Sequence, residues 1–359
     1  MNFVSLIMLA FSLLGALDRI LGNRFGLGKE FERGFMLLGN MALSMIGMIV
    51  LAPVLAEWLQ PFCAWVYDAL HIDPSVIPAA LFANDMGGAP LAEQTAQHAG
   101  VGMFNALVVS SMMGCTVSFT IPYALGVVEK EHHRDLFLGL LCGIVTIPVG
   151  CFVSGLCCGL SMGLLLINLL PLILLSVLIA AGLLLLPDFT VKLFSIIGVF
   201  IKILITIGLS LGILKALTGL EPIKGLADIK EGGNICLNAA IVLSGAFVLM
   251  NLVSKLLAKP ISGLGRRLGI NETAAMGLLS TIVTNATTLE MVNRMDKKGI
   301  VLNSAFLVSA AFMLGGHLAF TMAYDTAYIL PMVVAKIVAG LSSLVVALFV
   351  YKRMEKEPR

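Results

Sequence analysis

Long apolar stretches separated by short polar segments run along the whole chain. A helix that spans a membrane needs about 20 mostly apolar residues. Nine stretches meet this requirement, namely 3–20, 35–59, 102–127, 136–159, 163–186, 200–219, 235–257, 303–323 and 329–350. The pattern therefore predicts an all-α membrane protein with about nine transmembrane helices.

Two further apolar segments, 75–96 and 270–295, are interrupted by polar residues, glycine or proline. The first contains Asn84-Asp85 followed by Gly87-Gly88, and the second contains Thr284-Asn285, Thr287-Thr288 and Glu290. Each segment could be a broken crossing or a re-entrant hairpin. A third interpretation makes the first segment an external loop in which Asp85 is a solvated helix cap.

The composition agrees with a membrane protein and excludes several other classes. Hydrophobic residues make up 59% of the chain and charged residues only 12%, where a soluble domain has about 25% charged residues. The net charge of +2 does not fit a basic nucleic-acid-binding surface. The seven cysteines have no ligand-type histidine spacing, so we expect no disulfide framework, no metal site and no cofactor.

The distribution of Lys and Arg distinguishes the two topologies, because basic loops favour the cytoplasmic side. If both interrupted segments are re-entrant, nearly all basic loop residues lie inside, and Lys215, Lys224 and Lys230 lie outside. If both cross, the basic cluster at 255–267 is left outside. The re-entrant topology is favoured, with a periplasmic N-terminus and a cytoplasmic C-terminus.

A weak internal repeat accompanies this topology. A shift of 201 residues superposes Asn84 on Asn285 and the motif Phe-Thr-x-x-Tyr at 119–123 on the same motif at 320–324. We expect a first half at 1–160, a linking helix and interfacial segment at 161–199, and an inverted second half at 200–359. Inverted repeats of this kind are typical of transporters, whose substrate binds where broken helices meet near the midplane.

Asp85 is the principal candidate for chemistry. An acid at membrane depth is costly and is a functional candidate by default. The neighbouring Gly87 and Gly88 allow the backbone to approach a ligand closely, and Asn84 adds an amide. Because no equally deep Lys or Arg is evident to neutralise Asp85, the sequence favours an amine substrate.

The second interrupted segment and one histidine complete the candidate site. Thr284, Asn285 and Thr288 suit recognition of a hydroxyl group. Glu290 belongs to the same set, but it could equally pair with Arg294 four residues later. His317 is either a substrate or proton ligand or a buried packing residue. Tyr123 and Tyr324 either line the site or anchor the helices at the membrane interface.

An intramembrane enzyme, such as an aspartyl protease, is the alternative from a different class. Such an enzyme needs two helix-borne acids, and only Asp85 is convincingly deep. No nucleophile-base or metal-ligand spacing occurs elsewhere. A transporter is therefore the favoured class, with another small organic cation as the alternative substrate.

The chain also resembles the ethanolamine permease family encoded with bacterial ethanolamine-utilisation enzymes. The resemblance covers nearly the whole length and rests on several motifs in one order: LGALDRI at 14–20, FERGF at 31–35, LAPVLA at 51–56, DMGG at 85–88, GIVTIPVGC at 143–151, LGINE at 268–272, KGIVLN at 298–303 and GGHL at 315–318. Members of that family often carry Asp where this chain has Gly316. This departure leaves Asp85 as the acid of the candidate site.

The resemblance implies a multi-pass protein of the bacterial inner membrane that brings ethanolamine into the cytoplasm. Ethanolamine and the lipid bilayer are then the partners, with no nucleic acid and no cofactor. The sequence leaves open whether transport is passive or coupled to protons or sodium, how selective it is among amines, and what the oligomeric state is.

Overall fold

The computed structural model describes residues 3–356, and every regular element in that range is helical. Within these residues, eight helices are long and apolar enough to cross a membrane. The spans are Phe3–Ile20, Leu27–Leu70, Ala99–Val127, Lys130–Cys157, Met162–Leu185, Pro187–Thr218, Ile229–Leu256 and Thr326–Met354. The all-α membrane fold is thus confirmed.

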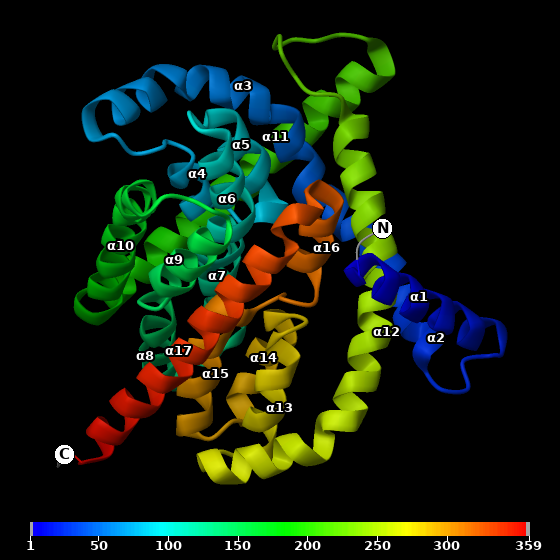
Figure 1. The fold of residues 1–359 in the computed structure, drawn as a ribbon, viewed down its shortest axis with the longest axis vertical. Helices are drawn as coiled ribbons and strands as arrows, with labels where there is room; N and C mark the ends of the chain where they lie inside the picture. The colour runs from blue at the N-terminus through cyan, green and yellow to red at the C-terminus, as the bar shows by residue number, and fades with distance from the viewer. Residues whose placement is uncertain (1–2, 357–359) are drawn as a thin grey trace.

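The first part of the chain runs from the projecting N-terminal helices into the centre of the molecule. Its helices are α1 (Phe3–Ile20), α2 (Leu27–Met36), α3 (Leu38–Leu70), α4 (Val76–Leu81), η1 (Asn84–Met86), α5 (Gly88–Thr95), α6 (Ala99–Phe104), the π-helices η2 (Asn105–Gly114) and η3 (Thr116–Thr120), α7 (Ile121–Val127), η4 (Lys130–His132), α8 (His133–Ile144) and α9 (Ile147–Cys157). Figure 1 shows α1 and α2 against α12, away from the central helices.

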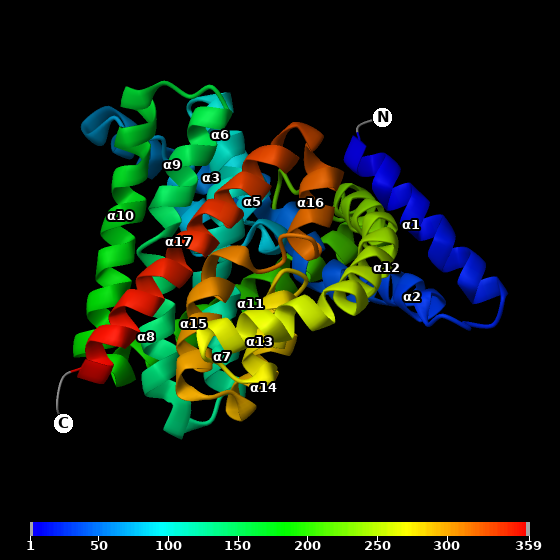
Figure 2. The ribbon, with the colours of Figure 1, turned by 60° about the horizontal axis from the view of Figure 1, so that its bottom comes forward.

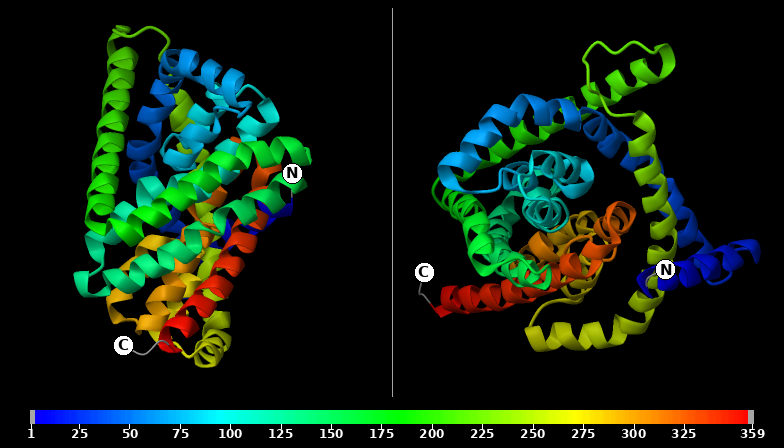
Figure 3. Two further views of the ribbon diagram at one scale, coloured as in Figure 1. Left: turned by 90° about the vertical axis from the view of Figure 1, so that its left-hand side faces the viewer. Right: turned by 45° about the horizontal axis from the view of Figure 1, so that its top comes forward.

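Two long helices connect this part to the rest of the chain. They are α10 (Met162–Leu185) and α11 (Pro187–Thr218), which begins 13 residues before the helix expected at 200–219. The remaining helices are α12 (Ile229–Leu268), α13 (Glu272–Thr281), α14 (Asn285–Met291), η5 (Val292–Arg294), α15 (Lys297–Ala310), α16 (Gly316–Tyr324), η6 (Thr326–Tyr328) and α17 (Ile329–Lys356). Figure 2 and the right-hand view of Figure 3 show α12 beside the central helices, reaching from α1 to α13.

The predicted span 303–323 is wrong, because the helix is broken in the middle. α15 ends at Ala310, and α16 starts at Gly316. The backbone N–H of Phe312 donates to Thr281 O at 3.2 Å, and that of Leu314 donates to Ile282 O at 2.9 Å. The unwound segment 311–315 thus directs two of its backbone N–H groups to the end of α13. Hydropathy averaged over a window does not detect such an exchange of partners.

Each interrupted segment is a hairpin whose two ends are held together by a carboxylate. In the first hairpin (73–98), Asp73 Oδ2 accepts from the backbone N–H groups of Gln97 at 3.1 Å and His98 at 2.9 Å. In the second hairpin (271–296), Asp296 Oδ1 accepts from the N–H of Asn271 at 2.7 Å. The chain therefore leaves each hairpin close to where it enters.

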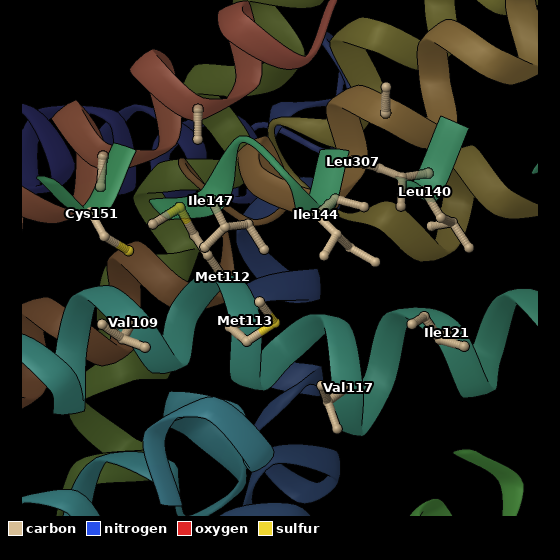
Figure 4. Packing of buried hydrophobic residues seen from close by; sticks show 14 of the residues in the cluster. Val109, Met112, Met113, Val117, Ile121, Leu140, Ile144, Ile147, Cys151 and Leu307 are labelled. Atoms are coloured by element: carbon tan, nitrogen blue, oxygen red, sulfur yellow. The ribbon is translucent and has the colours of Figure 1, made fainter. Parts of the chain in front are cut away.

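The buried core lies between the π-helical stretch and the helices that cover it. Val109, Met112, Met113, Val117 and Ile121 form one wall. Figure 4 shows Met112 directed toward Ile147 and Cys151 of α9, whereas Val117 points to the other side of its helix. Small residues permit close packing of these helices, since a Cβ at Gly143 would lie 2.6 Å from that of Val308. The first hairpin contacts α16 through η1, and the second contacts α15 through α13.

Candidate functional site

Asp85 lies at the break of the first hairpin, in the short turn between α4 and α5. Gly87 has a φ of 97°, which residues with a side chain rarely adopt. Gly88 packs against the carbonyl of Phe82, where there is no room for a Cβ. Neither glycine lines the cavity next to Asp85. The two glycines therefore shape the turn that presents the carboxylate.

A cavity of about 290 Å³ opens beside Asp85. Its lining comes from α3, from the first hairpin, from the π-helical stretch and from the break before α16. The lining residues are Asn40, Met41, Ser44, Ala83, Asp85, Met86, Cys115, Phe119, Phe312 and His317. The Asp85 side chain is 31% exposed. One carboxylate among aromatic, thioether and small polar groups suits a small cation with an apolar carbon skeleton.

His317 faces Asp85 from the first turn of α16. Its Nε2 lies 4.0 Å from Asp85 Oδ1, and its side chain is 1% exposed. The Phe312 ring packs against the imidazole, with a centroid separation of 4.9 Å. A Cβ at Gly316 would lie 3.7 Å from Asp85 Oδ2. The structure therefore brings together Asp85 and His317, which are far apart in the sequence.

Two asparagines occupy the breaks of the two hairpins. Asn84 and Asn285 are both fully buried. Asn285 Nδ2 donates to Thr120 Oγ1 at 2.8 Å, whereas both polar side-chain atoms of Asn84 lack a partner within the described residues. A buried amide without partners is costly. Asn84 is not among the residues that line the Asp85 cavity.

The remaining candidates of the second hairpin do not line the Asp85 cavity. Thr288 Oγ1 donates to Gly277 O at 3.0 Å and thus holds α14 against α13. Thr284 caps α14 and lines a different cavity, of about 320 Å³, together with Glu30 and Arg33. These contacts stabilise the hairpin and its neighbours.

Glu290 is exposed, and its partner is a tyrosine. The Tyr123 hydroxyl donates to Glu290 Oε1 at 2.8 Å. The alternative pairing with Arg294 does not occur among the ion pairs of residues 3–356. Tyr324, which the internal repeat equates with Tyr123, donates in the same way to Glu93 of α5. Each tyrosine thus bonds to a glutamate on the second arm of one hairpin.

Lys336 is the polar residue that sequence reasoning missed. It lies in α17, has an exposed fraction of 0%, and is close enough to Asp85 for an electrostatic interaction. The expectation that no equally deep basic residue accompanies Asp85 is therefore wrong. A lysine eight residues into the apolar stretch 329–350 was the available signal.

Comparison with known proteins adds the family. The family described as "Ethanolamine utilisation protein, EutH" matches residues 1–350. The chain belongs to the EutH family. It is 44% identical to the "Probable ethanolamine permease EutH" of Listeria monocytogenes over 98% of this chain and 94% of that protein. No solved structure matches.

Enterobacterial EutH proteins are similar over the same extent. The proteins named "Probable ethanolamine permease EutH" from Salmonella typhimurium and Escherichia coli are each 37% identical, over 97% of this chain and 94% of theirs. The resemblance identified from the motifs is confirmed. The chain is a multi-pass membrane protein of this permease family.

Proposed function

We propose that the protein carries protonated ethanolamine across the bacterial inner membrane into the cytoplasm. The observation that carries this proposal is the Asp85 carboxylate in a small, largely apolar cavity. The names of the EutH relatives support the substrate. A carboxylate at membrane depth replaces part of the hydration that an ammonium group loses in the membrane.

In this proposal, Asp85 binds the ammonium group and the nearby polar groups bind the hydroxyl. His317 Nε2 is 4.0 Å from Asp85 Oδ1, too far for a direct hydrogen bond. A small hydroxy-amine can therefore contact both side chains at once. Asn40 of α3 also lines the cavity, and Phe119 and Phe312 offer aromatic faces to the cation.

The buried Lys336 is compatible with a cation site because its ammonium is already engaged. All three of its hydrogen bonds go to backbone carbonyl groups. The ion pairs of residues 3–356 do not include Lys336 with Asp85. The Asp85 carboxylate can therefore pair directly with the ammonium group of the substrate. The charge of Lys336 affects this carboxylate only through a longer-range electrostatic interaction.

We further propose that both hairpins are re-entrant and belong to inverted halves, 1–160 and 200–359, with α10 and the start of α11 as the link. The N-terminus is periplasmic and the C-terminus cytoplasmic. This topology is supported by the basic residues, by the hairpin ends joined at Asp73 and Asp296, and by the two equivalent tyrosine–glutamate pairs. It places Glu93 toward the periplasm and Glu290 toward the cytoplasm.

Counterflow of labelled ethanolamine in proteoliposomes tests the proposal. The protein should exchange internal unlabelled ethanolamine for external label, and Asp85→Asn should lower the initial rate at least about tenfold, the effect of losing about 1.4 kcal/mol of binding energy. Asp68→Asn, which changes an exposed carboxylate of α3, is the matched control. Near-normal counterflow by a well-folded Asp85→Asn protein would contradict the proposed site.

A further inference from the structure

The ammonium of Lys336 is enclosed by backbone carbonyl groups. Its Nζ donates to Ser111 O at 2.7 Å, to Ala311 O at 2.9 Å and to Ser309 O at 3.3 Å. A protonated lysine has three N–H donors, and a neutral amine has only two. The three carbonyl oxygens match in number the three N–H donors of the charged form of this side chain.

Two of the three carbonyls lie at the break after α15, and the third lies inside the π-helix η2. Ser309 is in the last turn of α15, and Ala311 is the first residue beyond that helix. The last carbonyls of a helix have no partner within the helix and carry its negative dipole end. Ser111 belongs to the π-helix η2. A buried helix end of this kind needs a cation or a hydrogen-bond donor.

Broken helix ends with free carbonyls form the ion sites of many secondary transporters, where they bind the coupling cation. We infer that Ser111, Ser309 and Ala311 form such a cation site and that Lys336 fills it with a tethered ammonium in place of a free ion. Since Lys336 already occupies the site, ethanolamine uptake needs neither Na⁺ nor K⁺. The independence of uptake from Na⁺ and K⁺ rests on the proposed transport function. The occupation of the carbonyl site by Lys336 does not depend on that function.

The site also holds the wall of the substrate cavity in place. Ala311 immediately precedes Phe312, which has a φ of 60° and packs against His317. The ammonium fixes the first carbonyl of the unwound segment, and the bonds from Phe312 and Leu314 to the second hairpin fix the rest. Lys336 is thus a positioning residue for Phe312 and His317.

Chemical rescue tests the carbonyl site without any transport assay. Lys336→Ala removes the part of the side chain that n-propylammonium reproduces. The variant should unfold at a temperature at least about 4 °C lower than the wild type. Added n-propylammonium chloride should raise this temperature more in Lys336→Ala than in the wild type. Lys336→Met fills the same channel with an uncharged stem, so it should show no such rescue.

Lys202→Ala, at an exposed position of α11, is the matched control and should resemble the wild type. An unchanged unfolding temperature of Lys336→Ala would overturn the inference. So would propylammonium stabilisation that is equal in the wild type, Lys336→Ala and Lys336→Met, because the ligand would then bind elsewhere. If Lys336→Ala cannot be purified, the same comparison is made on membranes by the temperature at which the variant aggregates.

Ion replacement tests the functional consequence. Wild-type uptake of labelled ethanolamine into proteoliposomes should change by less than about twofold when Na⁺ and K⁺ are replaced by N-methyl-D-glucammonium. Uptake that requires either ion would contradict the inference. Absence of ethanolamine counterflow in every buffer would instead contradict the proposed function, and the rescue of Lys336→Ala would still decide whether the carbonyl site exists.

Discussion

Asp85 and His317 face each other across a cavity, with 4.0 Å between Oδ1 and Nε2. Asp85 lies in the turn of the first hairpin, and His317 follows the break between α15 and α16. Each residue therefore depends on a discontinuity in a helix. A movement of the first hairpin relative to α16 would change their separation, which is a property expected of a carrier whose site opens alternately to the two sides.

The contribution of the protein to uptake should be largest at acidic external pH. The amine of ethanolamine, like that of lysine, is protonated at neutral pH, and its neutral fraction rises about tenfold per pH unit. The neutral form crosses lipid unaided, whereas the ammonium form meets a large barrier. Initial uptake of labelled ethanolamine at micromolar concentration is measured in cells with and without the protein. The difference between the two uptake rates should become smaller as the external pH rises from about 6 to about 8.5. A difference that grows toward alkaline pH would argue against a site for the cation.

Gly316→Ala should weaken ethanolamine binding and leave the fold intact. The added Cβ would be 3.7 Å from Asp85 Oδ2 and 3.9 Å from Phe312, which are ordinary contact distances. A methyl group in contact with the Asp85 carboxylate crowds a ligand that binds there, an effect worth about 1 to 3 kcal/mol, so we expect a rise of about tenfold in Kd. Isothermal calorimetry on the purified protein measures it.

Gly126→Ala is the control for this substitution, because a Cβ there meets nothing within 4 Å. Its affinity and its unfolding temperature should equal those of the wild type. If both glycine variants bind ethanolamine as the wild type does, the substrate does not occupy the space between Gly316 and Asp85.

The two tyrosine–glutamate pairs should control access to the cavity from opposite sides. Tyr123→Phe removes the hydrogen bond to Glu290, and Tyr324→Phe removes that to Glu93. Cys115 lines the cavity and serves as a reporter when the other cysteines are replaced. We expect Tyr324→Phe to speed its labelling by an impermeant thiol reagent from the periplasmic side a few-fold, and Tyr123→Phe to do so from the cytoplasmic side.

The size of this effect follows from the energy of one exposed hydrogen bond to a charged group, about 1 kcal/mol after solvent screening. Tyr67→Phe, in α3 outside both pairs, serves as the control. Equal acceleration from both sides by each variant would mean that the pairs act on stability instead of on access.

Single cysteines in the two segments at the ends of the first hairpin, 60–74 and 96–101, should share one side of the membrane. Asp73 bonds to the backbone of Gln97 and His98, so the two segments meet at the same end of the hairpin. In a cysteine-free background, cysteines in both segments should react with an impermeant reagent added to the periplasmic side. Reaction of the two segments from opposite sides would rule out the re-entrant hairpin and the inverted repeat.

Much of the membrane architecture was predictable from the sequence alone. A run of about 20 apolar residues can satisfy its backbone groups in lipid only as a helix, so eight spans follow from local composition. The cluster Asn84, Asp85, Gly87 and Gly88 was equally visible, because an acid beside two glycines stands out in an apolar segment. His317 was identified because it is a polar residue that follows two glycines in an apolar segment.

Only the tertiary structure decided which polar groups meet and where a helix is interrupted. The break at 311–315 exists because Phe312 and Leu314 bond to the second hairpin. Lys336 is buried because carbonyls from η2 and the end of α15 surround it. Glu290 bonds to Tyr123 and not to the nearby Arg294. Hydropathy and spacing describe a residue's own neighbourhood, whereas burial and hydrogen-bond partners depend on segments that are distant in the chain.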